Sequence, residues 1–454
     1  MVRWRHPGRR DLWRLDPLGG HPRRHRASAD AEPRTGVSGA AAAAQPSRPV
    51  SRLAVGSWVL YDLANTIFSL NIVSLYFALW IVRDMGGRDA DYGFASAISQ
   101  VFVFVSAPFL GALSDQMPRR VPLLAISTLV CCLATAFLGV WGPAVGLILF
   151  IAANYAYQAG LVFYDALLPD VSSDTNRGRI SGLGSGIGYL GSFLGLAVGM
   201  LILTSDSQGK PTVFLWTGAL FALLSIPCFL FVRERVRGVG QPFVEAALRA
   251  IRELRDTLGR VRAYPGLGRF LIGRALYADA TTTIIVFMGV YVTQELGFTE
   301  RGAELVLAVG IAAAIVAGLV WGWVVDALGA RRTLNLVLGV WAIVFIGAAA
   351  VAYLRLPTYL FWIIAPLAGV GLAGTSTADR PLLLQLAPRD RIGQFYGLYA
   401  MIGRFAAIVG PALWGFIVDI LSLGRPAAVL SLLAMVIVSY VVLRPLRLIV
   451  DPTG

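Results

Sequence analysis

Long apolar runs separated by short polar connections fill the chain from Trp58 onward. The runs are about 20 residues long, which is the length that an α-helix needs to cross the hydrocarbon core of a bilayer. The pattern therefore predicts an all-α membrane protein with about twelve transmembrane helices. The predicted spans are 58–82, 92–114, 121–140, 144–166, 180–203, 212–232, 268–293, 303–325, 333–353, 358–379, 392–417 and 426–444.

These spans divide the chain into five segments. They are a basic tail (1–50), an N-terminal six-helix bundle (51–232), a cytoplasmic linker (233–266), a C-terminal six-helix bundle (267–446) and a short tail (447–454). The first tail lacks the apolar core of a secretory signal, so we expect it to be disordered or to contact anionic lipids. In the linker, Phe243, Ala247 and Ile251 begin an apolar repeat at helical spacing. This repeat indicates an amphipathic helix at the membrane surface or the bundle mouth, with a simple tether as the alternative.

Composition supports a membrane protein, with 57% hydrophobic residues, 14% charged residues and a mean hydropathy of +0.69. The net charge of +13 does not indicate a nucleic-acid partner, because the arginines lie in the tails and in loops between apolar runs. Arginines gather in the even-numbered connections, at Arg119/Arg120, Arg177/Arg179, Arg331/Arg332 and Arg389/Arg391. The positive-inside rule then places both termini in the cytoplasm. In a bacterium, this multi-pass protein would lie in the cytoplasmic membrane.

The positions of the histidines and cysteines do not suggest a metal or catalytic site. The three histidines lie in the N-terminal tail, and the three cysteines lie within apolar runs. No nucleophile is paired with a base, so we expect no metal site, no cofactor and no enzymatic activity.

Two similar loops divide the chain into homologous halves. Gly111 and Gly322 are 211 residues apart, and so are Asp115 and Asp326. A repeat of this size predicts two pseudo-symmetric six-helix bundles. The loops resemble the signature that follows the second helix of each half in the major facilitator superfamily. We expect them to form gates rather than a substrate site, through Gly111, Asp115, Arg119, Arg120, Gly322, Asp326, Arg331 and Arg332.

Ionisable residues within the spans are the candidates for function, because each is costly in hydrocarbon. Asp62 begins a polar stripe with Asn65 and Thr66, and Asp279 with Thr283 occupies the related position in span seven. A carboxylate at Asp62 could bind a proton, a cation or a substrate amine, and a lock between helices is the alternative.

Further polar residues lie in spans four and eleven. Arg404 is near the middle of span eleven, where it either pairs with Asp62 or Asp279 or binds a substrate carboxylate. Asn154 and Gln158 lie on one face of span four. We expect Arg274 to reach toward the membrane interface, and Asp165, Asp379 and Arg380 to take part in pairing near the cytoplasmic ends of their spans, with loop arginines as partners of the acids.

Several motifs narrow the resemblance to the vacuolar-effluxer-like branch of the superfamily. Tyr61-Asp62-Leu63-Ala64-Asn65 resembles the Tyr-Asp-Trp-Ala-Asn opening of that branch. Gly178-Arg179-Ile180-Ser181-Gly182 and Phe395-Tyr396-Gly397-Leu398-Tyr399 also match. The departures are Leu63 for Trp, Asp165 where Asn is expected and Ala280 for Gly. Because fungal members are associated with amino-acid export from the vacuole, the resemblance implies small zwitterions as substrates.

The sequence therefore predicts a secondary active transporter that moves a small solute by alternating access. We expect a monomeric exporter of amino acids or similar zwitterions, embedded in the lipid bilayer. The coupling ion would be a proton or another ion, with Asp62 as the proton site and Asp279 as its partner. A drug or lipid exporter of the same fold and a non-transporting scaffold or sensor are the alternatives.

Overall fold

The computed structural model describes residues 51–87, 89–205, 209–234, 242–259 and 266–446. These residues form helices and connecting loops, and no strand occurs among them. Both predicted tails, 1–50 and 447–454, lie outside the described residues. Parts of the predicted linker, 235–241 and 260–265, also lie outside them.

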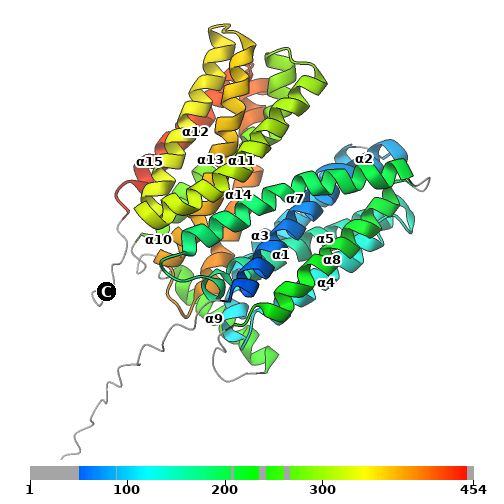
Figure 1. Cartoon of the computed structure of the whole chain (residues 1–454), viewed down its shortest axis with the longest axis vertical. Helices are drawn as coiled ribbons and strands as arrows, with labels where there is room; N and C mark the ends of the chain where they lie inside the picture. The colour runs from blue at the N-terminus through cyan, green and yellow to red at the C-terminus, as the bar shows by residue number, and fades with distance from the viewer. Residues whose placement is uncertain (1–50, 88, 206–208, 235–241, 260–265, 447–454) are drawn as a thin grey trace, which may run out of the picture. The chain divides into compact units, whose positions relative to one another are not determined.

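The spans of the first half follow one another from α1 to α8 along the chain (Figure 1). The first span is α1 (Arg52–Phe68), which continues through the π-helical η1 (Ser69–Leu75), α2 (Tyr76–Leu79) and η2 (Trp80–Asp84). The others are α3 (Asp89–Gln116), α4 (Val121–Ala136), α5 (Gly142–Asp165), α7 (Arg177–Ser205) and α8 (Lys210–Phe231), with the short α6 (Leu168–Val171) between α5 and α7.

The second half follows the linker helix α9 (Phe243–Gly259). Its spans are α10 (Leu267–Val290) with η4 (Tyr291–Glu295), α11 (Glu300–Leu328), α12 (Ala330–Tyr353), α13 (Phe361–Leu386) preceded by η5 (Thr358–Leu360), α14 (Ile392–Gly415) with η6 (Phe416–Ile420), and α15 (Arg425–Leu443). Eleven of the described helices are long and apolar enough to cross a membrane, and α4 is a shorter apolar helix of 16 residues. The prediction of an all-α, multi-pass membrane protein is confirmed.

Packing within the two halves follows one scheme. In the first half α1 packs on α7 and α8, and in the second half the equivalent α10 packs on α14 and α15. Likewise α4 packs on α5 and α8, as α12 packs on α13 and α15. Each half has its own buried apolar cluster, which includes Phe77, Phe150 and Phe214 in the first half and Trp341 and Phe345 in the second.

The two halves contact each other through α3 against α14 and through α7 against α11. Glycine makes these contacts close. A Cβ on Gly111 would lie 2.1 Å from the carbonyl oxygen of Gly393, and one on Gly182 would lie 2.3 Å from that of Gly318. Backbone therefore meets backbone at both junctions.

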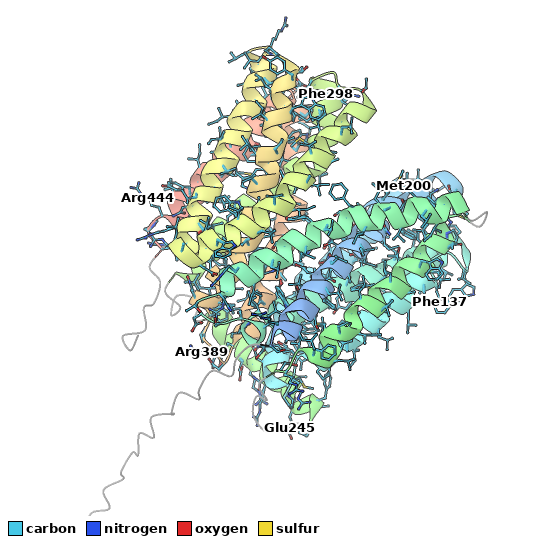
Figure 2. The ribbon with its side chains drawn as sticks, viewed as in Figure 1. Phe137, Met200, Glu245, Phe298, Arg389 and Arg444 are labelled. Carbon is cyan, nitrogen blue, oxygen red and sulfur yellow. The ribbon has the colours of Figure 1, made fainter. Side chains whose placement is uncertain are left out.

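The polar loops at one end of the helices contain Arg119, Arg120, Arg389 and Arg391. Figure 2 shows Arg389 and Arg444 at this end, and Phe137 and Phe298 at the other. We call this end of the helices the arginine-rich end. It is formed by the connections 117–120, 166–176 and 387–391 and by Gly329.

The linker helix α9 packs on α3 near this end. Ala246 and Ala250 are fully buried against Ala112 and Leu113. The bulkier apolar residues Phe243, Val244, Leu248 and Ile251 are exposed on the protein surface. The helix thus uses small residues to approach α3 and leaves its larger apolar side chains facing outward.

Candidate functional site

Asp115 was expected in the first of the two similar loops, but it lies in the last turn of α3, which continues to Gln116. It joins α3 to the start of α14. Its two carboxylate oxygens accept hydrogen bonds from the backbone N–H groups of Gly393 and Gln394, each at 2.8 Å. Both N–H groups belong to the first turn of α14, where they have no partner within the helix. The carboxylate also lies at the positive end of the helix dipole, so charge and hydrogen bonding favour the same contact.

Arg120 holds Asp115 in place from within the first half. Its side chain is fully buried, forms an ion pair with Asp115 and donates from Nη1 to the carbonyl oxygen of Ala166 at 2.9 Å. The Glu234 carboxylate accepts from the backbone N–H of Arg120 at 2.6 Å. Arg119 is exposed.

Asp326, expected in the second loop, also lies in the last turn of a helix, α11, and makes the corresponding contact with the start of α7. It accepts from the backbone N–H groups of Gly178 and Arg179, at 2.7 and 3.2 Å, and from Nε of Arg179 at 2.7 Å. A Cβ on Gly322 would lie 2.9 Å from the Cα of Arg179. Each aspartate therefore joins the end of a helix in its own half to the first turn of a helix in the other half.

The second loop lacks the buried arginine of the first. Arg331, the counterpart of Arg120, donates to the carbonyl oxygen of Arg444 at 2.5 Å. Arg332 is exposed. Asp326 instead takes its cation, Arg179, from the other half.

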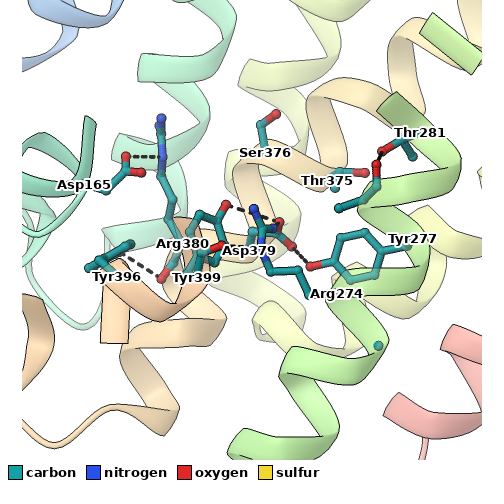
Figure 3. Close-up of polar contacts among 12 residues, drawn as sticks. Asp165, Arg274, Tyr277, Thr281, Thr375, Ser376, Asp379, Arg380, Tyr396 and Tyr399 are labelled. Carbon is teal, nitrogen blue, oxygen red and sulfur yellow. Dashed lines mark hydrogen bonds and ion pairs between the residues drawn. The ribbon is translucent and has the colours of Figure 1, made fainter. Parts of the chain in front are cut away.

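An ion cluster joins the halves where α5 ends at Asp165. Arg380 of α13 lies with Nε 2.9 Å from Oδ1 of Asp165 on α5 and with Nη1 3.5 Å from Oδ2 of Asp62 on α1. Its guanidinium also lies 5.7 Å from the ring centres of Trp58 and Tyr164. Figure 3 shows Arg380 beside Asp165.

The neighbouring Asp379 points into the second half (Figure 3). It forms an ion pair with Arg274 of α10 and accepts from the hydroxyl groups of Tyr277 and Tyr399, at 2.5 and 3.3 Å. The expectation that Arg274 reaches the membrane interface is wrong, because Arg274 is only 9% exposed and its guanidinium lies over the ring of Tyr399. The partners expected for Asp165 and Asp379 are also corrected, since both pair with arginines of helices rather than of loops.

Arg404 of α14 is placed among amides. It donates from Nη2 to Oε1 of Gln158 on α5 at 2.6 Å and from Nη1 to Oε1 of Gln100 on α3 at 3.2 Å. The predicted pairing of Arg404 with Asp62 or Asp279 does not occur in this conformation. No described acidic side chain forms an ion pair with Arg404.

Among the described residues, no hydrogen bond or ion pair joins Arg404 to the remaining candidates. Asn154 is fully buried and donates to the hydroxyl of Ser99 at 2.7 Å. Thr66 donates to the backbone carbonyl of Asp62 at 3.0 Å, and the buried Asn65 leaves its Nδ2 without a partner. Asp279 and Thr283 are buried on α10 against the backbone of Gly410 on α14.

Sequence reasoning left several members of these clusters out of the candidate site. Span ten was expected to end at residue 379, whereas α13 continues to Leu386, so Asp379 and Arg380 lie within the helix. The adjacent opposite charges of Asp379 and Arg380 next to an apolar run could have indicated that both belong to the site. No feature of the sequence indicated Gln100, because a single amide in an apolar helix is common and its partner, Arg404, is distant in the chain.

The chemistry available is ion pairing and hydrogen bonding between the two halves. In the described part of the chain, no group of three or more His, Cys, Asp or Glu side chains is placed to hold a metal ion.

Comparison with solved structures supports the fold. A bacterial homologue of the iron transporter ferroportin in an outward-facing state aligns with a TM-score of 0.68 and 16% identity, over 87% of this chain and 99% of that one. The proton:xylose symporter XylE aligns with a TM-score of 0.61 and 14% identity, over 86% of this chain and 93% of that one. At such identities the likeness concerns the fold alone.

Sequence relatives agree with this fold. An MFS-type transporter of Bacillus subtilis, YxiO, is 26% identical over 406 residues, which cover 85% of this chain and 93% of the relative. Autophagy-related protein 22 of Gibberella zeae is 26% identical over 275 residues, which cover 55% of this chain and 41% of the fungal protein. The family model described as "Vacuole effluxer Atg22 like" matches residues 92–450. The chain therefore belongs to the vacuole effluxer Atg22-like family, and it is a transporter of the major facilitator superfamily rather than an enzyme.

Proposed function

We propose that this transporter is a secondary active exporter of amino acids or similar small zwitterions, and that Arg404 binds their carboxylate. The placement of Arg404 carries the proposal. It is a cation of the second half held by two neutral amides of the first half, Gln100 and Gln158. A guanidinium in a membrane span calls for an anion or water beside it.

The hydrogen-bonding groups around Arg404 suit a carboxylate. A guanidinium presents a planar set of N–H donors that can bind both oxygens of a carboxylate at once. Its Nε is buried and has no partner in this conformation. Gln100 and Gln158 now accept from the guanidinium, and their amide NH₂ groups can donate to a bound anion.

The ion cluster suits the amine of a zwitterion. Asp62 and Asp165 of the first half share Arg380 of the second half. A substrate ammonium would compete with Arg380 for these carboxylates. Binding of a substrate would then weaken a contact between the halves, which is what alternating access requires.

The conformation fits one stage of such a cycle. The contacts of Asp115 with α14 and of Asp326 with α7 hold the halves together at the arginine-rich end. If this end faces the cytoplasm, as the positive-inside rule predicts, the contacts must break for the exporter to take up its substrate. The sequence contains no ATPase motif, so the drive would be an ion gradient or the gradient of the substrate itself, and we propose a proton gradient.

Counterflow in proteoliposomes tests the proposal. Vesicles loaded with a mixed amino-acid panel should exchange labelled amino acids in a saturable way. Arg404→Ala should lower the exchange roughly 10- to 100-fold, because it removes charge-assisted hydrogen bonds worth about 1.5–3 kcal/mol. Arg389→Gln is the matched control, since the Arg389 side chain is 91% exposed.

A comparison of ligands separates carboxylate binding from a structural role of Arg404. Each exchanged amino acid is compared with its carboxamide, which keeps the amine and the side chain. The wild type should discriminate strongly against the amide, and Arg404→Ala should not. Undiminished exchange in folded Arg404→Ala contradicts the proposal. Exchange of lipophilic cations or lysolipids instead would favour a drug or lipid exporter, and absence of flux would favour a scaffold or sensor.

A further inference from the structure

The two halves contain the same arrangement of an acid, a threonine and a glycine. Asp62 and Thr66 of α1 face Gly188 of α7, where a Cβ would lie 3.4 Å from Oδ2 of Asp62 and 3.5 Å from Oγ1 of Thr66. In the second half Asp279 and Thr283 of α10 face Gly410 of α14. The threonine follows the acid by four residues in both cases, so the two side chains share a helix face.

The two acids differ in their counter-charge. Asp62 has Arg380 as its partner. Asp279 is only 2% exposed, yet no described side chain forms an ion pair with it. Its Oδ1 and the Oγ1 of the fully buried Thr283 have no hydrogen-bond partner.

The charged side chains of the helices around Asp279 are engaged elsewhere. On α10 itself Arg274 pairs with Asp379 of α13, and on α13 Arg380 pairs with Asp165 and Asp62. The other described charges on neighbouring helices are also bonded: Arg404 of α14 to two amides, Asp326 of α11 to Arg179, and Arg425 of α15 to Glu295 of η4. An ionised Asp279 would therefore be a buried charge without a counter-charge, which is unfavourable.

We propose that Asp279 is the proton-binding site of the transport cycle, with its carboxyl protonated in this conformation. A neutral carboxyl removes the uncompensated charge and can donate its own hydrogen bond, with Thr283 as the adjacent oxygen. A metal cation fits less well, because it needs several oxygen ligands and the backbone of Gly410 lies against both oxygens. A Cβ on Gly410 would lie 1.9 Å from Oγ1 of Thr283 and 2.3 Å from Oδ1 of Asp279.

The position of Gly410 links this proton to the movement of the halves. Helix α14 is held to the first half by Asp115 at its start and by Gln158 through Arg404. Pro411, next to Gly410, removes one backbone hydrogen bond and lets the helix bend at this point. When α14 moves with the opening of the arginine-rich end, Gly410 leaves Asp279, water reaches the carboxyl and the proton passes to that water.

Infrared spectroscopy of the full chain in lipid nanodiscs tests protonation directly. The wild type at neutral pH should show the C=O stretching band of a protonated carboxyl, and Asp279→Asn should lose it. Asp62→Asn is the matched control, because it changes the equivalent acid in the other half, and it should keep the band. A band that persists in Asp279→Asn, or that disappears in Asp62→Asn instead, would overturn the assignment.

A second variant covers the case in which Asp279→Asn does not fold. Thr283→Val keeps the size of the side chain and removes only the hydroxyl, so it should shift the band without abolishing it. An unshifted band overturns the placement of the proton beside Thr283.

The role of Asp279 in coupling rests on the proposed transport function, whereas its protonation does not. A band assigned to Asp279 in a protein that transports no amino acid would contradict the proposed substrate and leave the proton site intact. Amino-acid exchange by a protein whose band is unchanged in Asp279→Asn would support the proposed substrate and contradict the proton site. A Na⁺-dependent stabilisation that is lost in Asp279→Asn, without a carboxyl band, would replace the proton by a cation.

Discussion

Arg380 on α13 lies with its Nε 2.9 Å from Oδ1 of Asp165 on α5, so a buried ion pair joins the two halves of the transporter. Both side chains are nearly inaccessible, with exposed fractions of 13% and 12%. Such a pair adds modest net stability, but removal of one partner leaves the other charge without compensation.

Arg380→Gln should therefore destabilise the protein by about 3–5 kcal/mol, since it leaves Asp62 and Asp165 facing each other. Asp165→Asn should cost less, because Arg380 keeps Asp62. Thermal unfolding in detergent measures both changes, and the exposed Arg389→Gln serves as the control. Equal losses in Arg380→Gln and Arg389→Gln would contradict the importance of the ion cluster.

Neutralisation of Asp115 and neutralisation of Asp326 should have different effects on the stability of the protein. Asp115→Asn leaves the fully buried Arg120 without its acid, so we expect a loss of about 3–5 kcal/mol. Asp326→Asn releases Arg179, whose side chain is 44% exposed, and should cost about 1 kcal/mol or less. Midpoints of thermal unfolding of the two variants give the comparison. A larger loss in Asp326→Asn would contradict the asymmetry.

Gly111→Ala should open the arginine-rich end, because its Cβ would overlap the backbone of Gly393. The effect is measured as faster reaction of a Gln394→Cys variant with a water-soluble maleimide, since Gln394 is now buried. Gly339→Ala is the control, as no atom lies within 4 Å of a Cβ there. If the two alanine variants react alike, the close contact of the halves does not control access.

Cysteine labelling in intact cells tests the orientation in the membrane. Arg389→Cys, at the arginine-rich end, should react only after the cells are permeabilised, as the positive-inside rule requires. Tyr359→Cys, at the opposite end and 65% exposed, should react from outside. The native cysteines are buried and provide a low background. The reverse pattern would invert the proposed direction of transport.

The apolar pattern was sufficient to predict the fold. Runs of about 20 residues are decisive in a chain where lipid is the solvent, and the 211-residue repeat of Gly111 and Gly322 gave the two halves. The ends of the helices were harder to predict, because apolar composition changes gradually along the chain. The end of α13 at Leu386, rather than near residue 379, changed the interpretation of Asp379 and Arg380.

The partners of charged residues could not be read from the sequence. The contact between Arg404 and Gln158 joins residues 246 positions apart, and it depends on how the two halves pack against each other. Symmetry suggested that Asp62 and Asp279 form a related pair. The structure instead gives one of them a cation and leaves the other without one.

The contact of Asp115 with α14 should tolerate exchange of the Gln394 side chain but not of Gly393, where a Cβ would lie 2.8 Å from Oδ1 of Asp115. Its donors are main-chain N–H groups, which every amino acid except proline possesses. Exchange of the Gln394 side chain therefore leaves the donor in place, and Gln394→Pro would delete it at a position in the first helical turn, where proline is accommodated. The acidic side of this junction is lost by any substitution that removes the carboxylate, whereas at Gln394 only proline removes the donor.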